Sequence, residues 1–217
     1  MYTFNKLVVT IGVKTPSGTL TMLGSGFFVE ATKIVTASHV IGNNHNELRM
    51  LVPNMDSCES IQDTTMTEVK AVRVEVIEFD PIRDIAILKI KDGEVSGTLP
   101  TLGSIDSVPV GGRVQIFGFP HCTDQRRVFT YQSAEVGAKV WLESYQVKSK
   151  YFILNIQARP GQSGSLIYYP DTHEIVGMLN GAYIPERKAM AVIADINLHE
   201  LNQTTQCVSA EYIKEML

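Results

Sequence analysis

The sequence contains few cysteines, and the three it has, Cys58, Cys122 and Cys207, lie far apart in a chain of 217 residues. A disulfide-stabilised domain needs an even set of cysteines at regular spacing, so such a framework is excluded and free thiols in a reducing compartment are expected. The cysteines also lack the paired spacing of a zinc site. We therefore expect neither a metal nor another cofactor.

Long apolar runs and dense positive charge are also missing. No apolar run approaches the roughly 20 residues that span a bilayer, and the N-terminus shows neither the charged nor the apolar segment of a signal peptide. The formal net charge is −4, and basic clusters such as Arg126-Arg127 are short. Nucleic acid and membrane are therefore not expected as partners, and a cytoplasmic location is expected.

Short strand-like runs make up most of what is present. They are rich in Val, Ile, Phe and Tyr and are bounded by Gly, Pro, Asn and Asp, which is typical of an all-β sandwich or barrel. Strands are predicted at residues 7–13, 26–29, 33–36, 48–52, 69–79, 85–90, 113–119, 128–131, 151–156, 166–169, 175–179 and 190–196. Helical periodicity appears only at the end, where Ser209 is predicted to cap a short helix near residues 209–217.

A segment rich in glycine and proline, residues 92–112, divides these runs into two groups of about six. Such a composition marks a boundary between packed units. We therefore predict two six-stranded units, over residues 1–100 and 101–217. The polar stretch 54–67 is predicted to be an exposed loop.

The candidate chemistry is concentrated in a tight turn between two predicted strands, Arg159-Pro160-Gly161-Gln162-Ser163-Gly164-Ser165. Glycines at 161 and 164 permit backbone conformations that a side chain would forbid. The turn can therefore direct the amides of Gly161 and Ser163 at one point beside the Ser163 hydroxyl. Two converging N–H donors next to a nucleophile are what an acyl-transfer site needs to bind an oxyanion.

A serine nucleophile also needs a base and an acid that orients the base. His39 lies at the end of an apolar strand, within residues 34–40, and Asp84 opens the apolar run 84–90. Each alone also fits a structural role, as a histidine at a strand end or as a turn aspartate. Their order with Ser163, however, is the order of the chymotrypsin-like catalytic triad.

Four motifs follow one another between about residues 7 and 200. The first is a pair of segments, 24–29 and 36–40, and the others are 79–90, 110–120 and 160–165. They resemble the chymotrypsin/trypsin-like serine proteases, and the HtrA/Deg-type protease domain in particular. The resemblance implies a double barrel, with two six-stranded antiparallel β-barrels. His39 and Asp84 would lie on the first barrel and Ser163 on the second.

The resemblance also implies a role for each residue. Ser163 would attack the scissile carbonyl, His39 would remove and return the proton, and Asp84 would orient the imidazole. The amides of Gly161, Gln162 and Ser163 would form the oxyanion hole. The substrate would pair as an added strand with residues 180–182, and the substrate-binding residues would be Gln157, Ala158, Arg159, Asn180, Gly181 and Ala182.

The sequence departs from the family's pattern at several points. Ser165 stands where many members have a second glycine after the nucleophile. Gln162 stands where secreted digestive members have an aspartate that pairs with a newly cut N-terminus, so activation of that kind is not expected. No acidic residue lies at the expected base of the specificity pocket, so a strong preference for lysine or arginine is not expected. No PDZ domain is recognised.

Alternative functions follow from the same residues. An α/β-hydrolase needs G-x-S-x-G and the order Ser, Asp, His, and Ser165 breaks that motif. A catalytically silent double barrel that binds or regulates other proteins would use the same fold. An enzyme kept latent until a partner orders loops, such as 54–67, 123–127 or 137–150, is a third alternative.

We predict a trypsin-like serine endopeptidase that cleaves protein or peptide substrates through an acyl-enzyme intermediate. Because no signal for activation by cleavage is visible, we expect a narrow or partner-controlled specificity. An activating protein partner, the natural substrate and the oligomeric state stay open.

Overall fold

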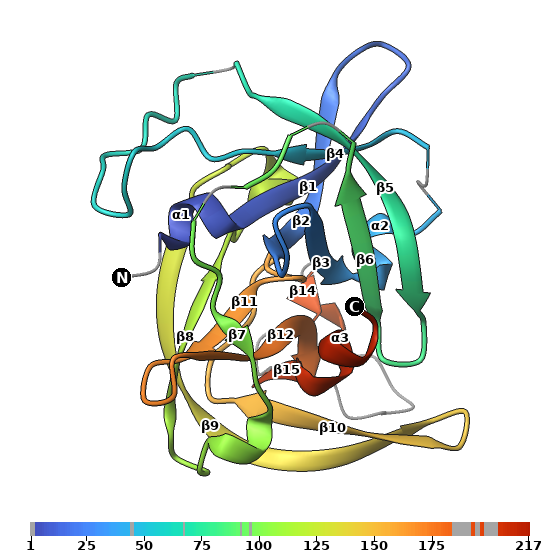
Figure 1. Ribbon diagram of the computed structural model, residues 1–217, viewed down its shortest axis with the longest axis vertical. Helices are drawn as coiled ribbons and strands as arrows, with labels where there is room; N and C mark the ends of the chain where they lie inside the picture. Colours follow the sequence, from blue (N-terminus) through green and yellow to red (C-terminus); the bar gives the residue numbers. More distant parts are fainter. Residues whose placement is uncertain are drawn as a thin grey trace.

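The computed structural model describes residues 3–43, 46–66, 68–91, 93–95, 97–183, 192–193, 196–197 and 204–217. Most of these residues form β-strands, in two units. Figure 1 shows most strands of the first half of the chain, blue to green, above most strands of the second half, yellow to red. None of the helices in these ranges is long and apolar enough to cross a membrane.

The first unit is a closed antiparallel barrel of six strands in the order β1-β2-β3-β6-β5-β4. Pairing of β1 with β4 closes it. The prediction of a first six-stranded barrel is therefore confirmed. Its strands are β1 (Val8–Lys14), β2 (Leu20–Phe28), β3 (Lys33–Ala37), β4 (Leu48–Leu51), β5 (Ala71–Asp80) and β6 (Ile85–Ile90), with helices α1 (Phe4–Leu7) and α2 (Ser38–Ile41).

The second unit is a seven-stranded sheet in the order β11-β8-β9-β10-β15-β12-β7, in which β11 also pairs with β12. The prediction of a second six-stranded antiparallel barrel is met only in part, because this unit is a seven-stranded sheet rather than a closed barrel and its strand β7 runs parallel to β12. The strands are β7 (Thr101–Leu102), β8 (Arg113–Gly118), β9 (Thr130–Ser144), β10 (Val147–Leu154), β11 (Leu166–Tyr169), β12 (Glu174–Tyr183) and β15 (Thr204–Ser209).

The remaining elements of the second half are short. Two 3₁₀-helices, η1 (Ile105–Ser107) and η2 (Cys122–Asp124), lie in its connections, and α3 (Glu211–Glu215) ends the chain as predicted. The residue that precedes α3 is Ala210, so the predicted capping role of Ser209 is wrong. The Ser209 hydroxyl instead accepts a hydrogen bond from the amide of Ile105 at 3.1 Å.

Three more predicted segments are the loops at 54–67 and 137–150 and the strand at 190–196. The segment 137–150, predicted to be a loop, forms most of the β9–β10 hairpin, and β15 is not predicted at all. The predicted strand at 190–196 lies partly outside the described residues, within which β13 (Val192–Ile193) pairs with β14 (Ile196–Asn197). Residues 54–66, predicted to be a loop, contain neither helix nor strand.

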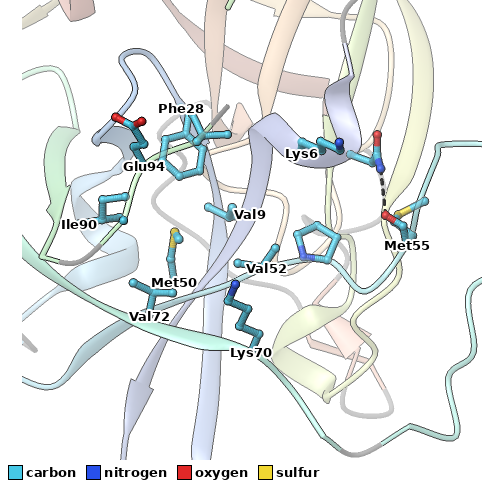
Figure 2. Close-up of a pocket in the computed structure, with 14 residues that line it drawn as sticks. Lys6, Val9, Phe28, Met50, Val52, Met55, Lys70, Val72, Ile90 and Glu94 are labelled. Carbon is cyan, nitrogen blue, oxygen red and sulfur yellow. Dashed lines mark hydrogen bonds between the residues drawn. The ribbon is translucent and has the colours of Figure 1, made fainter. Parts of the chain in front are cut away.

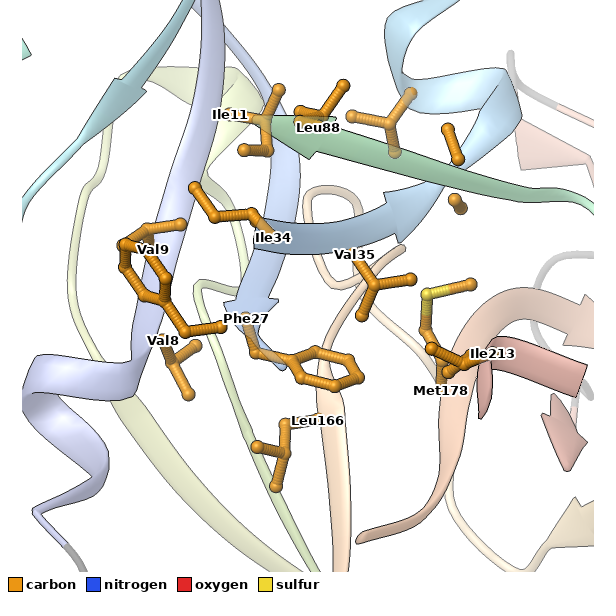
Figure 3. Close-up of a cluster of buried hydrophobic side chains, with 14 of the residues drawn as sticks. Val8, Val9, Ile11, Phe27, Ile34, Val35, Leu88, Leu166, Met178 and Ile213 are labelled. Atoms are coloured by element: carbon orange, nitrogen blue, oxygen red, sulfur yellow. The ribbon is translucent and has the colours of Figure 1, made fainter. Parts of the chain in front are cut away.

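One cluster of buried apolar side chains extends across both units. From the first unit it includes Phe27 and Val35, and from the second Leu166, Met178 and Ile213. Figure 3 shows Val35 beside Met178 and Ile213. Because burial of large apolar side chains is the main stabilising term in folding, this shared core holds the facing edges of the two units in place.

Candidate active site

The pairing of β3 with β6 brings His39 and Asp84 together. The two strands are antiparallel, with Ala37 opposite Ile85. His39 follows the end of β3 in α2, and Asp84 immediately precedes β6, so both project from the same end of this pair. The Nδ1 atom of His39 lies 2.7 Å from Oδ2 of Asp84, and 52% of the histidine side chain stays exposed.

The carboxylate of Asp84 accepts several hydrogen bonds. Its Oδ1 accepts from the amide of His39 at 2.9 Å and from the hydroxyl of Ser38 at 2.8 Å. Burial alone would raise the pKa of Asp84, but the hydrogen bond and charge of His39, with the bond from Asn180, hold that pKa below its ordinary value. An ionised carboxylate is an acceptor only, so Nδ1 carries the proton and Nε2 of His39 is left as the basic nitrogen.

Asn180, on β12, connects Asp84 with Ser163. Its Nδ2 donates to Oδ2 of Asp84 at 3.0 Å, and its main-chain carbonyl accepts from the Ser163 hydroxyl at 2.8 Å. The sequence predicts only a substrate-binding role for Asn180, so this use of its side chain is missed. Asn180, which is 6% exposed, therefore contacts two of the three predicted catalytic residues, and Asp84 contacts the third.

The Ser163 hydroxyl is directed at Asn180 rather than at the imidazole. Within the described part of the chain, no hydrogen bond joins Ser163 to His39. Rotation about one side-chain bond separates the staggered orientations of a hydroxyl. Hydrogen bonds between catalytic groups are often made only once substrate is bound, so this orientation is compatible with a nucleophile at rest.

The turn that carries Ser163 has the geometry of a type II turn. The amide of Gln162 donates to the carbonyl of Arg159 at 3.0 Å, Pro160 is the second residue, and Gly161 is the third with φ of 88°. A type II turn favours proline and glycine at these two positions. The Gln162 amide is used within the turn, so of the three amides predicted for the oxyanion hole it is the one already engaged in this structure.

The peptide between Pro160 and Gly161 is held by its carbonyl group. That carbonyl accepts from the amide of His121 at 2.6 Å. In a trans peptide the N–H points away from the C=O, so the Gly161 amide faces away from His121. Among the described residues, the amides of Gly161 and Ser163 have no acceptor. Both donors are therefore available for an oxyanion.

Ser25, on β2 of the first barrel, binds two carbonyl groups of this turn, those of Gly161 and Ser163. Its hydroxyl donates to the carbonyl of Gly161 at 2.8 Å and accepts from the amide of Phe119 at 3.0 Å. Its own amide donates to the carbonyl of Ser163 at 2.8 Å. Ser25 is fully buried, so these bonds are shielded from water and hold the turn against the first barrel.

The side chain of Gln162 braces the turn from the second unit. It is 2% exposed, its Oε1 accepts from the amide of Arg159 at 2.7 Å, and its Nε2 donates to Oε1 of Gln132 on β9 at 2.6 Å. A buried amide without partners would cost roughly 1–3 kcal/mol. These contacts show what the glutamine does at the position where the secreted digestive members of the resembled family have an aspartate.

The predicted substrate-binding residues fall into two groups. Arg159 is exposed and donates to Oε1 of Gln157 at 3.2 Å, while Ala158 packs against the apolar core of the second unit. Gly181 and Ala182 pair with β15 on one side. On the other side, the described pairings of β12 with β7 and β11 end at Met178. Within the described residues, this edge of β12 is therefore unpaired at Gly181 and Ala182.

A cavity of about 430 Å³ lies beside Asp84, between the β9–β10 hairpin and the ends of β12 and β15. Its walls include Glu143 and Tyr151 of the hairpin and Tyr183 of β12. None of the predicted substrate-binding residues lines it. Sequence reasoning misses this cavity because it assigns the hairpin to a loop. Among the described residues, no cluster of three or more His, Cys, Asp or Glu side chains could hold a metal ion.

A closed six-stranded barrel packed on a second sheet, with the candidate residues between them, defines the class of trypsin-like folds. Residues 24–178 match the sequence model of the trypsin-like peptidase domain. The chain belongs to the trypsin-like peptidase family, as the motif resemblance predicts. No curated protein sequence matches it.

Solved structures support the same fold. The MamO protease domain from Magnetospirillum magneticum is 15% identical, with a TM-score of 0.70 and coverage of 99% of this chain and 97% of that one. The active form of the Rv3671c protease from M. tuberculosis is 18% identical, with a TM-score of 0.66 and coverage of 98% and 80%. The HtrA-type protease AlgW, solved with a decapeptide, is 14% identical, with a TM-score of 0.65 and coverage of 99% and 66%. At these identities the likeness establishes the fold alone.

Proposed function

We propose that the chain is a serine endopeptidase whose catalytic residues are Ser163, His39 and Asp84. The observation that carries the proposal is the position of Asn180, which contacts both Ser163 and Asp84 while Asp84 contacts His39. The proposal takes the second sheet as the second barrel of the fold. The pairing of β11 with β12 supports that assignment.

In the proposed mechanism, Oγ of Ser163 attacks the scissile carbonyl carbon as its proton passes to Nε2 of His39. Asp84, ionised at neutral pH, stabilises the imidazolium that forms. The oxyanion of the tetrahedral intermediate accepts hydrogen bonds from the amides of Gly161 and Ser163. His39 then protonates the leaving amine, and a water molecule hydrolyses the acyl-enzyme by the same steps.

The proposed substrate is an extended peptide segment. Its backbone would pair with the open edge of β12 at Gly181 and Ala182, and side chains on one side of the cleaved bond would enter the cavity beside Asp84. Glu143 in the wall of that cavity would favour a basic or neutral side chain there. We place the enzyme in the cytoplasm, with narrow or partner-controlled specificity. Full activity of the isolated protein on unstructured casein would count against that control.

A second candidate function is a binding module that keeps the fold without the chemistry. The hydrogen bond of the Ser163 hydroxyl to Asn180, instead of to His39, is the observation that favours it. The two functions differ in whether the imidazole can activate the hydroxyl.

Labelling with a fluorophosphonate probe decides between them, since the probe reacts with an activated serine. We expect the native protein to label and both Ser163→Ala and His39→Ala to lose labelling. Ser17→Ala and His173→Gln change residues outside the site and should label as the native protein does. Absence of labelling in the native protein, both alone and with cell lysate added, would favour the binding module.

A further inference from the structure

A cavity of about 400 Å³ opens at one end of the first barrel, shown in Figure 2, and we call it the barrel-mouth pocket. Small barrels are either filled by side chains or hold one small ligand, and close packing is the rule in protein interiors. Five strands each contribute one apolar wall residue, namely Val9, Phe28, Met50, Val72 and Ile90.

Segments at the rim complete the wall. Val52, Met55 and Val95 add apolar surface, and the flexible side chains of Met50 and Met55 can adapt to the shape of a bound chain. Asn5 of α1 is 2% exposed. Its Nδ2 donates to the carbonyl of Met55 at 3.1 Å and its Oδ1 accepts from the thiol of Cys58 at 3.7 Å. Asn5 therefore fixes the rim, and its polar groups are already engaged.

The charged groups of the pocket are Lys6, Lys70 and Glu94. Figure 2 places Glu94 near Phe28 and Ile90, and Lys70 beside Val52. Both lysines are exposed, and among the described residues neither forms an ion pair. A sugar or nucleotide needs several converging polar groups in its site. This pocket offers instead apolar walls, the two lysines and one carboxylate, that of Glu94.

We infer that the barrel-mouth pocket binds an amphiphile made of an acyl chain and one anionic group. The chain lies against the five strand residues, and the anion is held by Lys6 and Lys70. The volume lies within the roughly 300–1,000 Å³ of small-molecule sites, which also occur at the mouths of β-barrels. A free fatty acid and an acidic membrane lipid share this chemistry.

This pocket is separate from the candidate active site. Strand β6 begins at Ile85, next to Asp84, and ends at Ile90 in the pocket wall. At about 3.3 Å per residue the two ends of that strand are roughly 17 Å apart. The inference therefore does not depend on the proposed peptidase activity.

The test uses the full chain labelled with ¹³C in its methionine methyl groups, followed by NMR during titration with sodium decanoate. Met50 and Met55 report the pocket, and Met178, buried on β12, is the internal control. We expect decanoate to shift Met50 and Met55 and to leave Met178 unchanged. From hexanoate through octanoate to decanoate, affinity should rise about fourfold for each added methylene.

The role of the lysines is tested with the double variant Lys6→Glu/Lys70→Glu, whose exposed positions should leave folding intact. We expect its affinity for decanoate to fall at least about tenfold and its preference to change to decyltrimethylammonium. Lys14→Glu/Lys214→Glu, a matched change of two other exposed lysines, should behave as the native protein does.

Vesicles of phosphatidylcholine with and without phosphatidylglycerol distinguish the two sources of the ligand. If the protein sediments with phosphatidylglycerol vesicles and decanoate reverses this, the ligand is a membrane lipid. If the protein does not sediment with these vesicles, the ligand is the free acid. The inference is overturned if Met50 and Met55 do not shift, if Met178 shifts with them, or if decanoate and decyltrimethylammonium bind the native protein equally.

Discussion

At the scale of single residues, the candidate site depends most on Asn180. Its side chain donates to Asp84 and its carbonyl accepts from Ser163, although Asp84 and Asn180 are 96 positions apart in the sequence. Since the asparagine is buried, its position is determined by β12, and through it the strand sets the distance between Asp84 and Ser163.

Asn180→Leu should make the protein more sensitive to acid. The pKa of Asp84 is lowered in the folded state, so its contribution to stability is present at neutral pH and is lost as the pH falls through the folded pKa. Removing the Asn180 bond raises that folded pKa, and the loss should begin at a higher pH. Urea unfolding from neutral pH down to about pH 3 measures it, with the exposed Asn43→Leu as control. Identical acid profiles for the two variants would contradict this role.

Ser25→Ala should weaken catalysis without weakening substrate binding. Its hydroxyl holds the carbonyl of Gly161, so its removal loosens the turn that presents the two proposed oxyanion donors. Loss of a whole oxyanion donor costs about 10²–10³ in kcat, and we expect a smaller effect here, about tenfold, with KM unchanged. Peptide hydrolysis measures both constants, and Ser17→Ala serves as control. A rise in KM at constant kcat would show that Ser25 acts elsewhere.

The three cysteines should differ sharply in reactivity. Burial raises the pKa of Cys122 to about 12 and that of Cys207 well above its ordinary value, whereas Cys58 is exposed. The thiolate is the reactive form, so iodoacetamide at neutral pH should modify the folded protein at Cys58 alone. Mass spectrometry of the digested protein identifies the modified positions. Alkylation of Cys122 in the folded state would be inconsistent with its burial.

At the scale of elements, the β9–β10 hairpin is a part of the fold that sequence patterns do not predict, whereas other strands are predicted well. Strands β6 and β11 are predicted with their observed bounds, because nearly every residue in them is buried and apolar. Strand β9 has an alternating pattern with one exposed face and many polar residues. Strand β15, with sequence TTQCVS, has few apolar residues. Strands that obtain their stability from pairing rather than from apolar runs are therefore the ones missed.

Hydrogen exchange should distinguish the hairpin from a true loop. Residues 137–144 and β10 are joined by a continuous ladder of strand pairing, whereas residues 54–66 form no strand. Paired amides exchange only when the structure opens, so peptides from the hairpin should exchange much more slowly than peptides from 54–66. Deuterium uptake measured by mass spectrometry checks this. Equal rates would support the loop that the sequence predicts.

At the scale of the whole molecule, helix α3 ties the end of the chain to the candidate site. The guanidinium of Arg83, next to Asp84, lies 4.4 Å from the centre of the Tyr212 ring, and its Nε donates to the hydroxyl of Ser149 at 3.0 Å. The Tyr212 hydroxyl accepts from the amide of Lys150 at 2.7 Å. These contacts join α3, the β10 strand and the turn before β6.

Tyr212→Ala should therefore destabilise the protein by about 3 kcal/mol, in line with loss of other buried aromatic side chains. Tyr212→Phe keeps the ring over Arg83 and removes only the hydroxyl, so we expect a loss of about 1 kcal/mol. Urea unfolding of both variants measures the difference. Equal losses would mean that the hydroxyl, and not the packed ring, carries the stabilisation.

How far the site is predictable depends on the sequence distance between its parts. His39, Asp84 and Ser163 are found because each lies in a local motif and the motifs follow a known order. The supporting contacts, Ser25 with Gly161 and Gln132 with Gln162, join residues 136 and 30 positions apart. No local pattern marks them, because the first arises only when the two units pack and the second only when the turn packs against β9. The Gln162 amide donates within the turn, and the Gly161 amide has no acceptor among the described residues. Local sequence does not predict this difference, because it depends on the orientation of the peptide between Pro160 and Gly161.

The turn at 159–165 is held by Ser25 from one unit and by Gln132 from the other, while the chain passes between the units once, after β6 and before β7. A cut in that connection would yield two fragments, one with His39 and Asp84 and one with Ser163. Neither fragment alone would contain an assembled site. Recovery of fluorophosphonate labelling on mixing them would then be a direct signal of their reassociation, so the fold could serve as a split reporter for the proximity of two fused proteins.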